Sequence, residues 1–191
     1  MPPRAKITRD MVLDAAFEIA QEKGAESINA RAVALRLGCS TQPVMYYFAT
    51  MEELKRVVYA RADEYHSAFL MNMERAKEGP LLEIGLNYVR FAREEPHLFQ
   101  LLFQSGRAGG GGLAQMAEAP ELAPVLEALR GTLGLPMAGT RAVFWTIALV
   151  AHGCASMIAN GFLDYNEEET AAQLKRAFRG AVLAAEEEKT R

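Results

Sequence analysis

Residues 36–48 read RLGCSTQPVMYYF, and this stretch decides the fold. Gly38 is followed closely by Ser40, a residue type that often caps the N-terminus of a helix, so that Pro43 falls at the third helical position. The N–H groups of the first helical turn have no acceptor within the helix, and proline therefore loses no hydrogen bond there. The stretch predicts two short helices, over 30–37 and 41–48, that are separated by a tight turn.

Two short helices joined by a turn of three to four residues that contains glycine are typical of a helix-turn-helix motif. The second helix of that motif enters the major groove of DNA, and its first residues face the base edges. We expect Thr41 and Gln42 to bond to bases, and Pro43 to make only apolar contact. The hydroxyls of Tyr46 and Tyr47 can donate to phosphates. An ordinary helical corner with exposed tyrosines is the alternative that the spacing leaves open.

Outward from this stretch, helical periodicity is nearly continuous and strand patterns are scarce. A first helix follows the N-cap candidate Thr8 and stops at Gly24, and Thr50 with Glu53 forms a capping box for a long helix that should reach Gly79. Further helices are expected over 81–95, 97–104, 122–133, 142–163 and around 174–185, with a loop at 106–112. About nine helices and no sheet predict an all-α protein.

Charge is distributed unevenly along the chain of 191 residues, whose net charge is −3. Residues 1–62 carry a net charge of +2 and residues 63–191 a net charge of −5. This distribution fits a small N-terminal domain that binds a polyanion, and it excludes a uniformly basic coat protein. The two cysteines, Cys39 and Cys154, lie far apart and fit a reducing compartment. The N-terminus lacks the apolar stretch of a signal peptide, and we expect a cytoplasmic protein.

The segment 142–163 contains no charged residue and is long enough to cross a bilayer. It also contains Thr146, His152 and Asn160, and no basic cluster flanks it. We therefore expect a helix that is buried on all sides within a protein, rather than a membrane span.

Catalytic patterns are absent from the sequence. There is no HExxH, GxSxG or phosphate-binding loop, and GRAGGGG (106–112) lacks the lysine that such a loop requires. The three histidines, His66, His97 and His152, do not have the spacing of metal ligands. We expect no catalytic site, no metal site and no cofactor.

The first 60 residues resemble the DNA-binding head of the TetR (tetracycline-repressor) family of bacterial regulators. The matching positions are Ile7, Ala15-Ala16, Gly24, Asn29, Val33-Ala34, Leu37-Gly38-Cys39-Ser40, Tyr47-Phe48 and Glu52-Glu53-Leu54. Further along, YVRFAREEPHLFQLLF (88–103), Trp145 and His152-Gly153 resemble a subgroup whose C-terminal domain carries a Trp…His-Gly signature.

The resemblance implies a set of DNA contacts. Thr41, Gln42 and Pro43 would be the variable base-reading residues, Met45 stands where the family usually has a DNA-contacting tyrosine, and Met51 stands where a lysine usually meets phosphate. The remaining expected contact residues are Lys6, Arg31, Ser40, Tyr46, Tyr47 and Lys55.

The resemblance also implies a DNA-binding domain over residues 1–50 and a ligand-binding and dimerisation domain over residues 51–191. The last two helices would form the homodimer, which would bind a palindromic operator in double-stranded DNA as a repressor and be released by a small, largely apolar effector. Residues expected to line the effector pocket are Tyr88, Phe91, Phe99, Phe103, Met116, Trp145 and His152. Two alternatives stay open: these aromatic side chains are simply core, or the protein is a dimeric ligand- or protein-binding module that no longer reads DNA.

Overall fold

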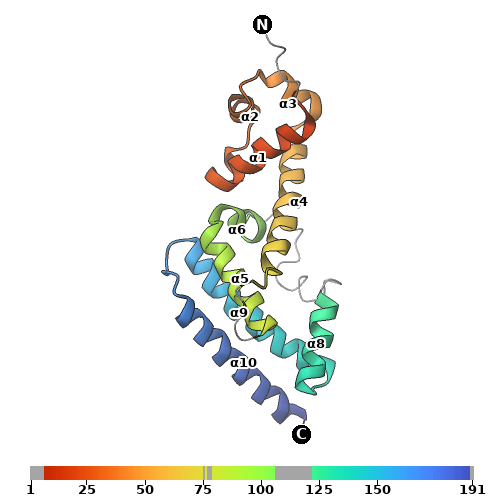
Figure 1. Cartoon of the computed structure of the whole chain (residues 1–191), viewed down its shortest axis with the longest axis vertical. Helices are drawn as coiled ribbons and strands as arrows, with labels where there is room; N and C mark the ends of the chain where they lie inside the picture. Colours follow the sequence, from red (N-terminus) through yellow and green to blue (C-terminus); the bar gives the residue numbers. More distant parts are fainter. Residues whose placement is uncertain (1–6, 75, 77–78, 106–121, 190–191) are drawn as a thin grey trace. The chain divides into compact units, whose positions relative to one another are not determined.

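The computed structural model describes residues 7–74, 76, 79–105 and 122–189, and within these ranges helices are joined by turns and loops, without strands (Figure 1). This confirms the prediction of an all-α protein. The expected loop at 106–112 lies outside the described residues. Besides the short 3-10 helix η1 (Ala25–Ser27), the described elements are α1 (Arg9–Lys23), α2 (Ala30–Arg36), α3 (Thr41–Tyr47), α4 (Met51–Leu70), α5 (Pro80–Glu94), α6 (Pro96–Phe103), α8 (Ala123–Leu133), α9 (Met137–Ala159) and α10 (Glu167–Lys189).

The chain divides into two compact units. The head unit comprises Met1–Ala68 and Glu95–Arg107, and the body unit comprises Phe69–Glu94 and Ala108–Arg191. The head unit therefore holds α1, α2, α3, α6 and most of α4, and the body unit holds α5, α8, α9 and α10. The functional boundary expected after residue 50 stays a prediction.

Side-chain caps fix where the first helices begin. The hydroxyl oxygen of Thr8 accepts from the Met11 N–H at 3.2 Å, and the side-chain oxygen of Asn29 accepts from the Ala32 N–H at 3.0 Å, as the sequence predicts. Ser40 occupies the N-cap position of α3 with extended backbone, but its side chain makes no capping hydrogen bond. The starts of α1 and α2 are thus held by their own sequence.

The helix α4 begins where the capping box predicts but ends earlier than expected. Thr50 accepts from the Glu53 N–H at 3.1 Å, and the Glu53 carboxylate accepts from the Ala49 N–H at 3.0 Å. The expected continuation to Gly79 is wrong, because α4 ends at Leu70. The side-chain amide of Asn87 donates to the carbonyls of Leu70 at 3.2 Å and Asn72 at 2.7 Å, and so satisfies backbone groups at the end of the helix.

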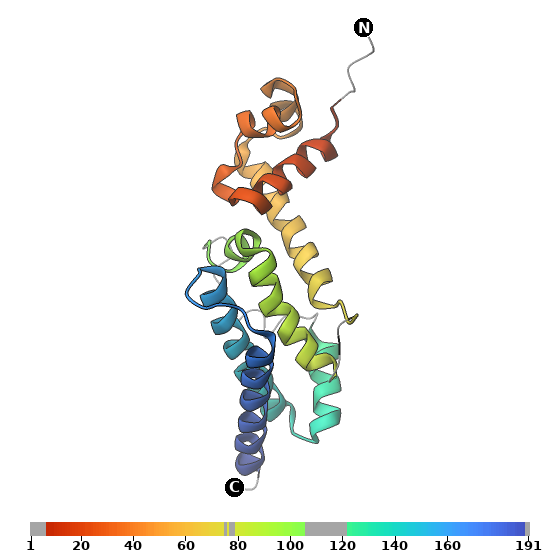
Figure 2. The ribbon, with the colours of Figure 1, turned by 60° about the vertical axis from the view of Figure 1, so that its left-hand side comes forward.

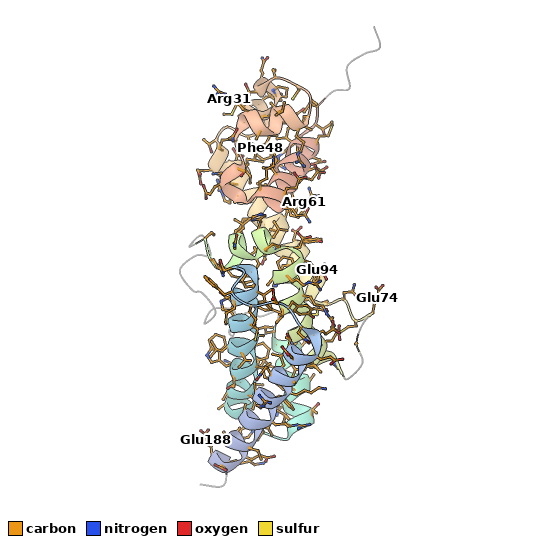
Figure 3. All side chains as sticks on the ribbon, turned by 90° about the vertical axis from the view of Figure 1, so that its left-hand side faces the viewer. Arg31, Phe48, Arg61, Glu74, Glu94 and Glu188 are labelled. Carbon is orange, nitrogen blue, oxygen red and sulfur yellow. The ribbon has the colours of Figure 1, made fainter. Side chains whose placement is uncertain are left out.

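Apolar side chains from each of the first four helices form the core of the head unit. Phe48, directly after α3, is fully buried among the head helices (Figure 3), and the guanidinium of Arg9 lies 4.8 Å from its ring centroid. Burial of one such aromatic side chain stabilises a fold by about 1.5–3 kcal/mol. The other fully buried large side chains of these helices are Val12, Val33, Val44, Leu54 and Val58. This core holds α3 rigidly at the surface.

In the body unit, α9 packs along both α5 and α10, and α8 packs on α9 (Figures 1 and 2). The backbone of α5 approaches α10 closely at Gly85, where a Cβ atom would lie 3.1 Å from a methyl group of Leu174. Glycine at this position therefore permits the close packing of the two helices.

One face of α9 is exposed in the single chain. The buried residues of this helix form a stripe of Thr140, Val143, Ile147, Ala151, Ala155 and Ala159. On another face, Leu149 is 50% exposed and Met157 is 47% exposed. The expectation of a helix buried on all sides is therefore wrong for one chain, because the described helices around α9 leave Leu149 and Met157 exposed. By length and composition alone, Met137–Ala159 could also cross a membrane.

Candidate functional site

The helix α3 presents one continuous exposed face. Val44 is buried, as is Phe48 directly after the helix, and these residues fix the inner side of α3. Successive residues of an α-helix are rotated by about 100° around its axis. Residues that do not share the direction of Val44 and Phe48 therefore point outward. The exposed residues of α3 are Thr41, Gln42, Met45 and Tyr46. The two residues expected to read bases, Thr41 and Gln42, thus both lie on the accessible face.

Two other predicted contact residues of α3 are half-buried. Pro43 lies toward the inner side of the helix, and the Tyr47 hydroxyl donates to the backbone carbonyl of Ile7 at 3.0 Å. Tyr46 is 80% exposed, and its ring packs edge to face on that of Tyr47 at 5.0 Å. A phosphate contact through Tyr46 needs no rearrangement, whereas Tyr47 already uses its hydroxyl proton to anchor the N-terminal segment.

The predicted basic contacts differ in their accessibility. Arg31 is exposed on the first turn of α2 and makes no ion pair with any residue that the structure describes (Figure 3). The side chain of Lys55 is only 12% exposed, and its Nζ lies 3.8 Å from the Glu26 carboxylate. Arg31 can therefore reach a phosphate, while Lys55 is directed toward an acid. Lys6 lies outside the described residues.

Two other cations of the head unit are held in ion pairs. Arg36, at the end of α2, forms ion pairs with both Glu18 and Glu22 of α1. Arg61 of α4 forms an ion pair with Asp14 of α1 and lies 4.8 Å from the ring centroid of Phe17. These pairs brace α1 against its neighbours.

In the body unit, Tyr88 of α5 and His152 of α9 form a polar pair. The Tyr88 hydroxyl oxygen lies 2.8 Å from Nδ1 of His152. Burial raises the pKa of Tyr88 and lowers the pKa of His152, so both side chains are neutral near pH 7. One hydrogen bond therefore joins the two side chains, and the tautomer of the imidazole decides which of them donates. This bond links α5 to α9.

The structure divides the other residues expected to bind the effector between the two units. Phe91 packs edge to face on Phe69 in the body unit, at a ring distance of 5.4 Å, and Trp145 is half-buried on α9. Phe99 and Phe103 belong to the head unit, where their ring centroids lie 4.9 Å apart. Met116 lies outside the described residues. A single pocket lined by all seven residues stays a prediction.

A buried ionic cluster in the body unit was not expected from the sequence. The guanidinium of Arg90 is buried and forms an ion pair with the buried Glu83, and it donates to the Asn87 side-chain oxygen at 2.8 Å. It also forms an ion pair with Glu167 at 2.9 Å, at the first residue of α10. The spacing of Glu83, Asn87 and Arg90 places all three on one face of α5, and this spacing was the available signal.

A small polar cavity of about 90 Å³ lies beside this cluster, lined by Phe69, Asn72, Glu74, Asn87 and Glu94. Pockets for drug-sized ligands typically have about 300–1,000 Å³. The lining includes none of the residues expected to bind the effector. Across the described ranges, His, Cys, Asp and Glu side chains form no group of three or more that could hold a metal ion.

Comparisons with known proteins agree with this architecture. A family model described as "Tetracyclin repressor-like, C-terminal domain" matches residues 81–181, which is more than half of the chain. None of the curated proteins compared with the sequence matches it. Among solved structures, a transcriptional regulator from Rhodococcus sp. Rha1 has a TM-score of 0.67 at 21% identity, with 94% of this chain and 98% of that chain covered.

Two further solved structures have the same fold. A TetR-like transcriptional regulator from Rhodococcus sp. RHA1 has a TM-score of 0.63 at 17% identity, over 94% of this chain and 98% of that one. The flavonoid-responsive regulator FrrA has a TM-score of 0.59 at 19% identity, over 92% of this chain and 95% of that one.

A helix-turn-helix head followed by a larger helical body defines a class of helical transcriptional regulators. Within that class, the match of the family model shows that this chain belongs to the TetR family. The subgroup with the Trp…His-Gly signature stays a prediction.

Proposed function

We propose that the protein is a repressor that binds a palindromic DNA operator as a homodimer and releases it when a small, largely apolar effector binds. The observation that carries the proposal is the exposed face of α3, on which both Thr41 and Gln42 are accessible. Gln can bond an adenine edge through two hydrogen bonds, and Thr can offer a hydroxyl or a methyl group.

The surface of α9 and α10 supports the dimer. Leu149 and Met157 of α9 and Leu183 of α10 are exposed large apolar side chains, and Gly153 on the exposed face of α9 leaves room for a close approach. A second copy that packs its own α9 and α10 against this face would bury all of them in a twofold-symmetric interface. Such a dimer would present two copies of α3 to half-sites about one turn of DNA apart.

The effector is proposed to bind in the body unit near Tyr88 and His152, with Phe91 and Trp145 as apolar lining. A ligand of this site would be mostly apolar or aromatic, with one or two polar atoms that bond to the Tyr88–His152 pair. It would release DNA by binding better to a dimer in which the two reading helices are wrongly spaced. Two relatives of the same fold carry names that fit such ligands, the flavonoid-responsive regulator FrrA and the multidrug binding protein EbrR complexed with imidazole.

The same dimer accounts for the apolar α9 without a membrane, because the partner covers its exposed face. We therefore place the protein in the cytoplasm. No catalytic role is proposed for any residue.

A selection from a library of random DNA duplexes tests this function. The wild-type protein is expected to enrich one palindromic sequence, and Gln42→Ala, at an exposed residue, is expected to lose or change that sequence without unfolding the head. If the wild type enriches no sequence, the protein does not read DNA, and its function lies in the body unit as a ligand- or protein-binding module.

A further inference from the structure

Met45 lies at the centre of the exposed face of α3. With about 100° between successive residues, Met45 projects between Thr41, about 40° away, and Gln42, about 60° away. Its side chain is 43% exposed, although the adjacent Val44 is fully buried. A surface that lies along this face of α3 and contacts both Thr41 and Gln42 therefore also contacts Met45.

The chemistry of this side chain restricts what it can contact on DNA. Methionine has no N–H or O–H donor, and its thioether is flexible and apolar. Without a donor, Met45 cannot form a hydrogen bond to a phosphate oxygen, which only accepts. In the major groove, the apolar group that a base pair presents is the C5-methyl of thymine.

We propose that Met45 is a specificity-determining residue that contacts the C5-methyl group of a thymine in each half-site of the operator. The inference rests on the proposed function, in which α3 enters the major groove. It assigns to Met45 an apolar reading role between the hydrogen-bonding residues Thr41 and Gln42. Tyr46, at the edge of the same face, is then the side chain of α3 that can reach the sugar-phosphate backbone.

The test makes two substitutions: one removes the C5-methyl group of a thymine in the operator, and the other removes the thioether of Met45. The operator is taken from the random duplex selection, in unmodified synthetic DNA, so that thymine is the only source of a C5-methyl group. Each thymine of one half-site is replaced in turn by deoxyuridine, and the Kd is measured by fluorescence anisotropy. For the wild type, one such replacement is expected to raise the Kd about three- to fivefold, which corresponds to the loss of one buried methyl group.

Variants at position 45 then show whether Met45 is the partner of that methyl group. Met45→Ala is expected to bind the thymine operator more weakly and to show no further loss with deoxyuridine at the sensitive position. Met45→Leu, which keeps an apolar side chain, should retain the penalty. Met71→Ala, a change at an exposed methionine of the body unit, is the matched control and should behave as the wild type.

The outcomes separate this inference from the proposed function. If an operator is selected and weakened by Gln42→Ala, but the deoxyuridine penalty is absent or persists unchanged in Met45→Ala, the role of Met45 is overturned and DNA reading stands. If no operator is selected, the proposed function and this inference fall together.

Discussion

The hydroxyl of Tyr88 is hydrogen-bonded to Nδ1 of His152 across 2.8 Å, and this bond links α5 to α9 inside the body unit. Two residues further along α5, Arg90 bonds to Glu167 at the start of α10. A single helix thus holds polar contacts with both of the helices that we propose to form the dimer. A change in α5 on effector binding would act directly on that pair of helices.

Replacement of Tyr88 by Phe removes this bond and keeps the ring. We expect the free energy of unfolding in urea to fall by about 1 kcal/mol, the usual net contribution of one hydrogen bond. Tyr46→Phe, at an exposed tyrosine of α3, is the control and should change stability by less than about 0.5 kcal/mol. Equal effects of the two variants would contradict a structural bond between Tyr88 and His152.

The buried Arg90 should be far more sensitive. Arg90→Leu leaves the carboxylate of Glu83 buried without its counter-charge, and we expect a loss of about 3–5 kcal/mol in the free energy of unfolding. The double variant Arg90→Leu with Glu83→Leu removes both charges and should recover much of this loss. Arg130→Leu removes an exposed pair with Glu127 and should cost less than about 1 kcal/mol. A cost for Arg90→Leu no greater than that for Arg130→Leu would show that the buried pair is not formed.

Stability should depend on pH through His66. Burial lowers the pKa of His66 from 6.5 to about 4. Between these values the unfolded chain binds more protons than the folded chain, so the free energy of unfolding is largest above pH 6.5 and falls as the pH drops toward 4. Between pH 7.5 and pH 5.0, the lowered pKa of His66 is expected to reduce the free energy of unfolding by about 2 kcal/mol.

Urea unfolding of His66→Leu at the two pH values isolates this contribution. The variant should lose about 2 kcal/mol less than the wild type between pH 7.5 and 5.0. His97→Leu, at a half-buried histidine of the same unit, is the control. Because it keeps His66, it should still lose the roughly 2 kcal/mol that His66 contributes between the two pH values. An identical pH dependence in His66→Leu and the wild type would contradict the lowered pKa.

The proposed dimer predicts that a charge on the exposed face of α9 dissociates it. Met157→Glu places a carboxylate on the exposed face of α9 that also carries Leu149 and Gly153, and burial of an unpaired charge in the proposed interface is costly. Light scattering after size exclusion should give the mass of one chain instead of two. Leu35→Glu, at an exposed leucine of α2, is the matched control and should remain dimeric. A dimer that survives Met157→Glu would place the interface elsewhere.

Local sequence signals were sufficient for most of the fold. The starts of α1 and α2 follow from Thr8 and Asn29, whose side chains bond to N–H groups three residues ahead in the same chain segment. The exposed face of α3 follows from the spacing of its apolar residues. Each of these features depends on residues within about one helical turn of each other. Such short-range relationships can be read from the order of residues in the sequence.

The remaining features depend on contacts between distant segments. The end of α4 at Leu70 involves Asn87, a residue of the next helix, whose side-chain amide donates to the Leu70 carbonyl. The ionic cluster joins Arg90 to Glu167, which is 77 residues away. Phe99 and Phe103 belong to the head unit and Tyr88 to the body unit because of which helices pack together, although these aromatic residues look alike in the sequence.

The most direct test of DNA reading is a fluorescence anisotropy titration of the selected operator with the wild type and Gln42→Ala, each at about 50 and 200 mM salt. We expect saturable binding by the wild type that resists competitor DNA and weakens steeply with salt, because phosphate contacts release counterions. Gln42→Ala should raise the Kd for the operator by about 5- to 150-fold and leave the affinity for random duplex unchanged. Equal binding of operator and random duplex by the wild type, or an operator affinity unaffected by Gln42→Ala, would contradict the account.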